Sequence, residues 1–413
     1  MRRKTIDYLI DFQCPQCGAP ATLAETDRLV TCAFCRVKSY LISSGVFHYC
    51  FSPKTPPEKP LIYFPYWRFK GMGFACTSVG VINRFFDISH QAAASIYFPP
   101  NVGFRSQALK LSFVTREIEG QFIEPSIPVS TMMEGAAARM KKNARTGVLH
   151  NAFIGDTTSL IYSPFYVKGK VYDAILNKAG PQPESGFNID ALKLNQPEWG
   201  IRFLPTLCPS CGWDLDGDRD AFVLICKNCN TAWKPAKDGL KKISLACIPE
   251  KKDDNPVYLP FWKITAKIDG IGLENYADFI RVANLPKVVR EGMEKRRFYF
   301  WSLGFKMRPR TFLTVSSSVT GAQLEDKVVS GLPEGRIAAV NLPAEEAVQS
   351  LLPILAQFLH PREGLDSILP KISIHPKHAL LVYVPFSEKH HELVHKKIPL
   401  AVNKNQLRLA SNL

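Results

Sequence analysis

The sequence predicts an α+β protein built as an internal duplication, in which each repeat is a small four-cysteine segment followed by a mostly antiparallel β module with one long helix. Three observations lead to this expectation: a cysteine pattern and a run of alternating apolar residues occur once in each half of the chain, and a Tyr-x-Pro-aromatic motif occurs twice in each half, in the same order. The chain of 413 residues is long enough for two or more domains, and its 46% apolar and 22% charged residues are typical of a globular protein.

The first element of each repeat is a pair of Cys-x-x-Cys motifs with a spacer of fourteen residues. Residues 14–35 read CPQCGAPATLAETDRLVTCAFC, and residues 208–229 read CPSCGWDLDGDRDAFVLICKNC. Four thiolates make a closed tetrahedral site that selects zinc, whereas redox dithiols or paired disulfides would not require two equal spacers. We therefore expect two structural Zn²⁺ ions, one held by Cys14, Cys17, Cys32 and Cys35 and the other by Cys208, Cys211, Cys226 and Cys229.

Both segments resemble the zinc-ribbon family, in which a cysteine knuckle, a hairpin and a second knuckle enclose one structural ion. The resemblance is confined mainly to these two ribbons and implies little about activity, since ribbons occur in transcription factors, helicases, polymerase subunits and protein adaptors. The layout is also similar to bacterial zinc-ribbon proteins that tend to be encoded beside membrane-stress proteins and are often labelled helicase-like. This chain has no Walker loop to support a helicase function.

The duplication extends beyond the ribbons. YFPYW at 63–67 is matched by YLPFW at 258–262, GF at 103–104 by GF at 304–305, and YSPFY at 162–166 by YVPFS at 383–387. The offset between partners grows along the chain, as expected when loops are inserted into one copy. The predicted organisation is ribbon 1 at 1–48, an α+β module at 49–177, a linker at 178–200, ribbon 2 at 201–240 and a second module at 241–413.

Strands and one helix are expected in each module. Residues 258–268, YLPFWKITAKI, alternate apolar and polar side chains with the period of a strand, and the four Tyr-x-Pro motifs predict four strand entries. A helix is expected after Pro343, with a kink or break at Pro353. In the first repeat, a capping box of Thr131 and Glu134 predicts a helix that ends at Gly147.

Residues 391–395 read HELVH and match the H-E-x-x-H pattern of zinc peptidases, which requires a helix. In the duplication this segment aligns with KVYDA at 170–174, which reads as a strand. On a strand the two histidines would lie about 13 Å apart, too far for one ion. No other catalytic signature is evident, so we expect no enzyme and no small-molecule substrate.

The net charge of +15 raises nucleic acid as a partner. A candidate surface lies in KRRFYFWSLGFKMRPR at 295–310, where aromatic residues alternate with the cations Lys295, Arg296, Arg297, Lys306, Arg308 and Arg310. Cations that bind phosphates and aromatic rings that stack on bases are typical of a groove for single-stranded nucleic acid. The alternative is that the aromatic side chains of an edge strand fill the core and the cations cap it. Two functions therefore stand: a zinc-stabilised adaptor that binds proteins, and a nucleic-acid-binding protein.

The remaining features concern the compartment. Cys50, Cys76 and Cys247 lack metal-site spacing and are expected as small buried apolar residues. Asp7 and Asp11 interrupt the only apolar run near the N-terminus, so no signal peptide is expected, and no uncharged apolar stretch has the length of a membrane span. These observations favour a cytoplasmic protein without a membrane span.

Overall fold

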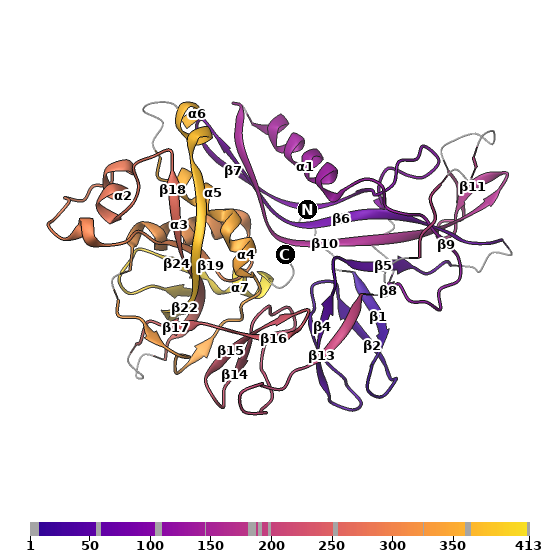
Figure 1. The fold of residues 1–413 in the computed structure, drawn as a ribbon, viewed down its shortest axis with the longest axis horizontal. Helices are drawn as coiled ribbons and strands as arrows, with labels where there is room; N and C mark the ends of the chain where they lie inside the picture. Colours follow the sequence, from indigo (N-terminus) through magenta and orange to yellow (C-terminus); the bar gives the residue numbers. More distant parts are fainter. Residues whose placement is uncertain are drawn as a thin grey trace.

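The computed structural model is a mixed α/β protein with many strands and few helices (Figure 1). It describes residues 8–54, 59–103, 110–144, 146–180, 187–188, 192–196, 200–250, 255–324, 326–359 and 365–410. Two large sheets lie on opposite sides of the view, and two small sheets lie below and between them.

The first large sheet is organised around two long antiparallel strands. Its strands within the described residues are β1 (Leu9–Gln13), β2 (Pro20–Ala24), β5 (Phe47–Phe51), β6 (Ile62–Thr77), β7 (Gly80–Gln91), β8 (Leu111–Phe113), β9 (Gln121–Phe122), β10 (Val148–Lys168), β11 (Lys170–Asp173) and β12 (Lys178–Ala179). β6 pairs with β10 on one side and with β7 on the other. Helix α1 (Val129–Asn143) covers β6 and β7 with Met132, Ala136 and Met140, which are spaced to share one helix face.

The second large sheet carries most of the helices. Its strands are β17 (Leu245–Cys247), β18 (Val257–Asp269), β19 (Phe300–Leu303), β20 (Val329–Ser330), β21 (Arg336–Ile337), β22 (Ser373–Lys389), β23 (Glu392–Val394) and β24 (Ala401–Asn403). The helices are α2 (Tyr276–Val282), α3 (Pro309–Ala322), α4 (Ala344–Ala347), α5 (Leu351–Ala356), α6 (Leu365–Ile368) and α7 (Lys404–Ala410), with short 3₁₀ turns η4 (Met293–Lys295), η5 (Val348–Ser350) and η7 (Leu369–Lys371). The long pair in this sheet is β18 with β22.

The two small sheets contain parts of the two ribbons. One consists of β3 (Leu29–Thr31), β4 (Lys38–Ser43) and β13 (Ile201–Pro205), in the order β13-β4-β3. The other consists of β14 (Leu224–Cys226), β15 (Thr231–Ala236) and β16 (Gly239–Ile243). β13 lies just before the second cysteine set in sequence, yet it completes the sheet of the first ribbon.

The two large sheets share the register of their long strands. In each sheet, the tyrosine of one Tyr-x-Pro motif lies opposite the proline of the other. The pairs are Tyr63↔Pro164 and Pro65↔Tyr162 in the first sheet, and Tyr258↔Pro385 and Pro260↔Tyr383 in the second. A parallel neighbour, β5 or β17, places Cys50 opposite Tyr162 and Cys247 opposite Tyr383.

A side-chain hydrogen bond is also repeated between the sheets. The indole Nε1 of Trp67 donates to the carbonyl of Ile127 at 2.6 Å, and that of Trp262 donates to the carbonyl of Leu342 at 2.9 Å. Each carbonyl lies directly before a helix whose N-cap is a proline, Pro128 for α1 and Pro343 for α4. The same side chain therefore ties the start of a helix to the long strand in both sheets.

The Tyr-x-Pro motifs do not all mark strand entries. YFPYW and YLPFW lie near the starts of β6 and β18, as predicted, but YSPFY and YVPFS lie near the ends of β10 and β22. The prediction of four entries is wrong because antiparallel pairing brings the start of one strand beside the end of its partner. The GF pairing is only partly described, because Phe104 lies outside the described residues. The backbone hydrogen bonds instead match Gly304 with Ala92. The Gly304 amide donates to the carbonyl of Pro260 in the second sheet, and the Ala92 amide donates to the carbonyl of Pro65 in the first.

The helices differ in detail from the predicted ones. α1 begins after Pro128 without a side-chain cap and ends at Asn143, so neither the capping box nor the stop at Gly147 is correct. After Pro343 the helix is interrupted by η5, which ends three residues before Pro353. A proline ring clashes with the carbonyl four residues earlier, which explains why the break precedes Pro353. No helix of the described residues is long and apolar enough to cross a membrane.

The main hydrophobic core joins the two large sheets. Met72 and Phe74 of β6 and Ile154 of β10 are buried in the same cluster as the residues of β18, β22 and α3. Phe74 contacts Phe312 of α3, with ring centroids 6.1 Å apart. The far ends of the long strands in the first sheet thus pack on helices of the second, which fixes the two sheets relative to each other and positions the ribbons between them.

Candidate metal centres on two packed ribbons

The structure gathers the eight predicted ligands into two four-cysteine clusters. Within each cluster the sulfur atoms all lie within 4.8 Å of one another, and these are the only such clusters among the described residues. The Sγ–Sγ distances are 3.8 Å for Cys14–Cys35 and 3.7 Å for Cys17–Cys32. The second cluster has 3.6 Å for Cys208–Cys229 and 3.5 Å for Cys211–Cys226.

These distances fit a tetrahedral ion and not disulfides. A zinc–sulfur bond of about 2.3 Å places tetrahedral sulfurs about 3.8 Å apart, whereas a disulfide requires about 2.0 Å. All eight cysteines are free thiols in the structure. Both clusters can therefore hold a metal ion, and four protein ligands leave no open coordination position for a substrate.

The knuckle turns explain how these short segments converge. Gly18 and Gly212 adopt positive φ angles of 70° and 74°, and their amides donate to the carbonyls of Cys14 and Cys208. This left-handed position after the second cysteine favours glycine. Backbone amides also point at sulfur: those of Cys35 and Phe34 lower the pKa of Cys32 to about 6. A turn that stabilises thiolates is suited to bind a cation.

The segment between the knuckles of ribbon 1 is not the predicted hairpin. β2 turns back on β1, which precedes the first knuckle, while β3 pairs with β4, which follows the second. Each hairpin therefore has a knuckle at its tip. Through β1, which also pairs with β8, the first hairpin belongs to the large sheet.

The two ribbons pack against each other around a shared apolar core. Leu29, Tyr40 and Ile42 of ribbon 1 are buried in one cluster with Leu215, Leu224 and Trp233 of ribbon 2. Polar contacts cross the same boundary: the Tyr40 hydroxyl donates to the carbonyl of Ala221 at 2.9 Å, and the Leu29 amide donates to the carbonyl of Arg219 at 2.8 Å. This packing could not be predicted from the sequence, because the contacting residues lie more than 170 positions apart.

Ribbon 1 is held to the first large sheet by a buried ion pair. Glu25 is 0% exposed, and its Oε2 lies 3.4 Å from the Nε of Arg68 on β6. The other carboxylate oxygen accepts a hydrogen bond from the Ser159 hydroxyl at 3.0 Å, and the Arg68 guanidinium lies 4.3 Å from the ring centre of Tyr8. A charged pair this deep is stable only when both partners are present.

Ribbon 2 is held to the second large sheet by a different polar chain. Asn341 donates from its side-chain amide to Asp220 at 2.7 Å, and its carbonyl oxygen accepts from the Lys306 amide at 2.7 Å. The Phe222 amide donates to the carbonyl of Val340 at 2.8 Å. Burial lowers the pKa of Lys306, so this lysine belongs to the interior and not to a surface.

The predicted basic-aromatic surface is divided by the fold. Four of its five aromatic residues, Phe298, Phe300, Trp301 and Phe305, are buried, and the half-buried Tyr299 has the Lys263 ammonium 4.0 Å from its ring centre. Among its cations, Lys306 is buried and Arg296 covers the ring of Tyr276 at 4.6 Å. Lys295, Arg297, Arg308 and Arg310 are exposed. The aromatic faces needed to stack bases are thus turned into the core, as the structural alternative for this segment describes.

The HELVH segment lies on a strand and its turn. Glu392–Val394 form β23, which pairs with β22, and His391 lies in the preceding turn. His395 is buried with its ring against Phe386, and its Nδ1 accepts from the Lys397 amide at 3.1 Å. The two histidines are not on one helix face, so this segment lacks the geometry of a zinc peptidase.

Cys50, Cys76 and Cys247 are buried, as predicted, and burial raises the pKa of Cys50 to about 11 and that of Cys76 to about 12. Neutral buried thiols of this kind behave as small apolar residues.

No protein-family model, curated protein or solved structure matches this chain. The functional reading therefore depends on the geometry of the chain itself.

Proposed function

We propose that the protein is a non-catalytic, zinc-stabilised adaptor of the cytoplasm that acts through protein–protein contacts. The metal centres support this function because four cysteine ligands close each site, and closed sites serve structure. Zinc is the metal we assign, since it accepts tetrahedral thiolate coordination without redox chemistry. The packed ribbons and their attachments to both large sheets would give such an adaptor a rigid surface.

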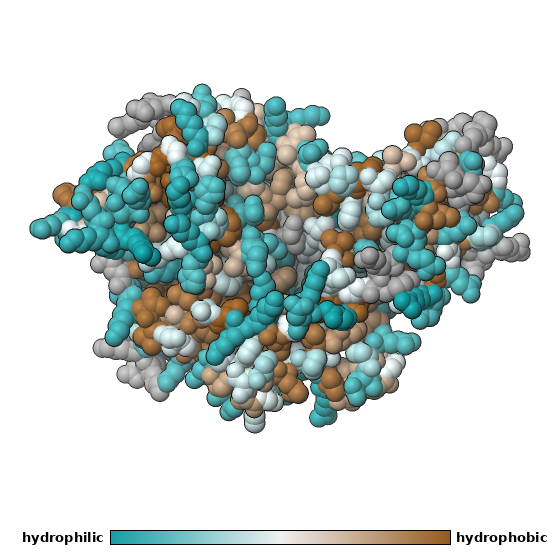
Figure 2. All heavy atoms as spheres, viewed as in Figure 1, coloured by the Kyte–Doolittle hydropathy of each residue, from teal (hydrophilic) through white to brown (hydrophobic). Residues whose placement is uncertain are grey.

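One observation carries the proposal: large apolar side chains are exposed directly beside the ligand cysteines. Phe34 lies between two ligands of ribbon 1 and is 69% exposed, and Trp213 of ribbon 2 is 61% exposed. Leu207, which precedes Cys208, is 53% exposed. Aromatic residues held on a rigid turn are typical anchors of protein interfaces. Figure 2 also shows apolar side chains gathered over the lower part of the second large sheet.

We also propose that the chain arose by internal duplication of a ribbon and a module, with the boundaries predicted above. The repeated register of the Tyr-x-Pro motifs, the repeated cysteine beside them and the repeated indole hydrogen bond support this. Unrelated sheets would have no reason to share all three. The copies have diverged in their helices, since the second carries α2 and α3 in addition to the segmented helix after Pro343.

The adaptor proposal is tested by crosslinking in cells, followed by mass spectrometry of the captured proteins. The variant Phe34→Ala/Trp213→Ala should lose crosslinks to partner proteins, while the matched control Val288→Ala, which changes an 80% exposed residue far along the chain, should keep them. Unchanged crosslinks in the double variant would contradict the role of the knuckle aromatics.

Nucleic acid is examined in the same preparation by measuring the affinity for single-stranded oligonucleotides at increasing salt. Because the aromatics are buried, we expect only weak binding that disappears by about 0.2 M salt, and Arg297→Glu should reduce the slope of log K against log salt by about 0.7. Sub-micromolar binding that survives at that salt concentration would favour the nucleic-acid function instead.

A further inference from the structure

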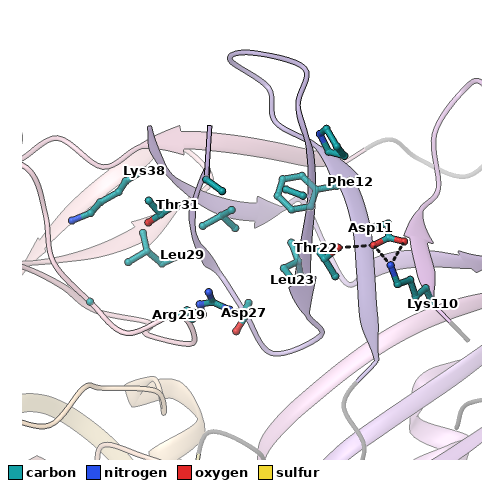
Figure 3. A pocket seen from close by; sticks show the side chains of 15 residues that line it. Asp11, Phe12, Thr22, Leu23, Asp27, Leu29, Thr31, Lys38, Lys110 and Arg219 are labelled. Carbon is teal, nitrogen blue, oxygen red and sulfur yellow. Dashed lines mark hydrogen bonds and ion pairs between the residues drawn. The ribbon is translucent and has the colours of Figure 1, made fainter. Parts of the chain in front are cut away.

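A groove of about 680 Å³ lies in ribbon 1, and Gly217 and Arg219 of ribbon 2 also line it (Figure 3). Its walls are the two hairpins of ribbon 1, and Arg219 of ribbon 2 lies at its base between them. Leu23 and Leu29 lie in opposite walls and are largely buried. The volume lies within the range of roughly 300–1,000 Å³ that is typical of ligand pockets.

Both walls of the groove are edge strands. β2 is the last strand of the first large sheet, and β3 is the last strand of its small sheet, so neither has a second partner among the described strands. Edge strands present backbone donors and acceptors at regular spacing, which a third strand can pair with. On β3 the amide of Leu29 already donates to the carbonyl of Arg219, so an extended peptide would pair with the edge of β2.

The register of β2 shows which backbone groups face the groove side. The amides of Cys14 and Glu25 bond to the carbonyls of Ala19 and Tyr8, so the odd-numbered residues of β2 exchange hydrogen bonds with β1. The backbone groups of Pro20 and Thr22 must point the other way. Asp27 already occupies the next position, since its Oδ2 accepts from the Ala24 amide.

Three backbone groups of β2 are thus available: the carbonyl of Pro20 and both the carbonyl and the amide of Thr22. No hydrogen bond to the Thr22 amide occurs among the described residues, and the residue is exposed. Pro20 has no amide to satisfy, which makes it compatible with an edge position. A peptide residue opposite Thr22 would make two hydrogen bonds, and the residue two positions away in the peptide would donate to the Pro20 carbonyl, while the residue between them would make neither bond.

The charges of the groove indicate the composition of its occupant. Three cations line the groove, and two of them are held by close ion pairs: Lys38 lies 3.2 Å from Asp216, and Lys110 lies 3.1 Å from Asp11. Arg219 is the cation with the longest ion pair. The side chain of Arg219 is 81% exposed and lies 3.9 Å from Asp27, its only ion-pair partner within the described residues. Phe12 stacks on Phe203 at 5.8 Å, so its ring face is already covered and offers little for a nucleic-acid base.

We infer that this groove binds an extended segment of a partner protein, which adds as a strand to the edge of β2 at Thr22 and carries an acidic side chain toward Arg219. Alternate residues of the segment would pack on the half-buried Ala21 and Val30, which line the groove from its two walls. This inference rests on the proposed adaptor function and assigns it a partner of defined chemistry.

The test uses a phage-displayed library of dodecapeptides selected on the metal-loaded full chain. Selected peptides are synthesised, and their affinities are measured by fluorescence anisotropy. Thr22→Pro should weaken binding at least about tenfold, because it removes the donor and places a ring in the groove. The matched control Thr22→Ala loses the same hydroxyl but keeps the amide, and should stay within about threefold.

Two further measurements do not depend on the folding of the proline variant. Methylation of the peptide amide that donates to the Thr22 carbonyl should cost about tenfold on the unchanged protein, while methylation of its neighbour should cost much less. Arg219→Glu should weaken acidic peptides about fivefold, whereas Lys227→Glu, which is similarly exposed on ribbon 2 but lies outside the groove, should not.

The outcomes separate the groove from the adaptor function. If peptides bind and their affinity is unchanged by Thr22→Pro, by Arg219→Glu and by amide methylation, the inference about the groove is wrong, whereas a protein-binding function is still supported. If no library peptide binds the unchanged protein more tightly than about 100 μM, the groove inference is also wrong. Loss of peptide binding in Thr22→Pro together with intact crosslinks in Phe34→Ala/Trp213→Ala would support the groove and reject the knuckle aromatics.

Discussion

Replacing Arg68 by methionine should detach ribbon 1 from the first large sheet. The methionine keeps an apolar chain of similar length over the ring of Tyr8 but removes the cation beside Glu25. Glu25 is then left as a fully buried carboxylate whose remaining hydrogen bond comes from the Ser159 hydroxyl. Burying an unpaired charge is the most costly outcome that this site allows.

The size of the effect follows from the burial of the two partners. Removing one member of a buried ion pair costs about 3–5 kcal/mol. The second ion pair of Arg68, to Asp87 at 3.2 Å, adds less than about 1 kcal/mol because the aspartate side chain is 38% exposed. In Glu25→Gln/Arg68→Met the charge is gone and the amide can still bond Ser159, so a loss of only about 1–2 kcal/mol is expected. The predicted coupling between the two positions is about 2 kcal/mol or more.

The measurement is a double-mutant cycle on the free energy of unfolding in guanidinium chloride at pH 7, with zinc present throughout. Hydrogen exchange of the β1 and β2 amides reports whether ribbon 1 opens before the rest of the chain. Lys227→Met is the matched control, since it breaks an exposed pair to Asp216 at 3.0 Å and should cost less than about 1 kcal/mol.

The reasoning would be refuted by a cost below about 1 kcal/mol for Arg68→Met, or by a double variant as unstable as the sum of the single ones. Either result would mean that water reaches Glu25 once Arg68 is removed, and that β1–β8 pairing alone holds the ribbon. Exchange of the β1 amides would then be unchanged in the variant.

Two other predictions concern the metal and the pH. Elemental analysis should find two zinc ions per chain and one in Cys208→Ser. Because Cys208 lies in the same buried cluster as Tyr40 of ribbon 1, this variant should also speed hydrogen exchange in ribbon 1. Unchanged exchange there would contradict the shared core. Hydrogen bonds from Lys404 and Arg336 lower the pKa of Glu388 to about 2 from an ordinary value of 4.5. The contribution of Glu388 to stability is therefore complete above pH 4.5 and is lost as the pH falls through about 2. The protection factors of the α7 amides, which are corrected for the intrinsic pH dependence of exchange, should fall over that pH interval. Glu388→Gln should lower these protection factors already at neutral pH and show a smaller further loss on acidification.

The parts that could be predicted from the sequence are those fixed by residues close together along the chain. A Cys-x-x-Cys turn largely determines its own geometry, so all eight cysteines of the two candidate metal sites were identified. The strand character of the HELVH segment was also predicted, because its alignment with residues 170–174 carried the pattern of a strand. The paired Tyr-x-Pro motifs were found for the same reason, although only two of the four begin a strand.

The parts that could not be predicted depend on distant contacts. Glu25 and Arg68 lie 43 positions apart (68 − 25), and nothing near either residue shows that they meet in the interior. Lys306 reads as a surface cation in a basic segment, but packing places it against Asn341. α3 could not be predicted because its serines and threonines are poor helix formers. The hydroxyl oxygens of Ser316 and Thr320 accept hydrogen bonds from backbone amides of β19, so these side chains join the helix to the sheet.

The position of β13 has a consequence for the order in which the chain is made. Ser43, at the end of β4, precedes its partner Ile201 by 158 residues (201 − 43). At a synthesis rate of about 5–20 residues per second, ribbon 1 waits roughly 8–30 s on the ribosome before its third strand emerges. During that interval the cysteines of ribbon 1 can already bind metal, while the edge of β4 stays open to whatever extended chain is nearby. Metal loading and sheet completion are thus separated in time, and a nascent chain that stalls before residue 201 would carry a loaded but unfinished ribbon.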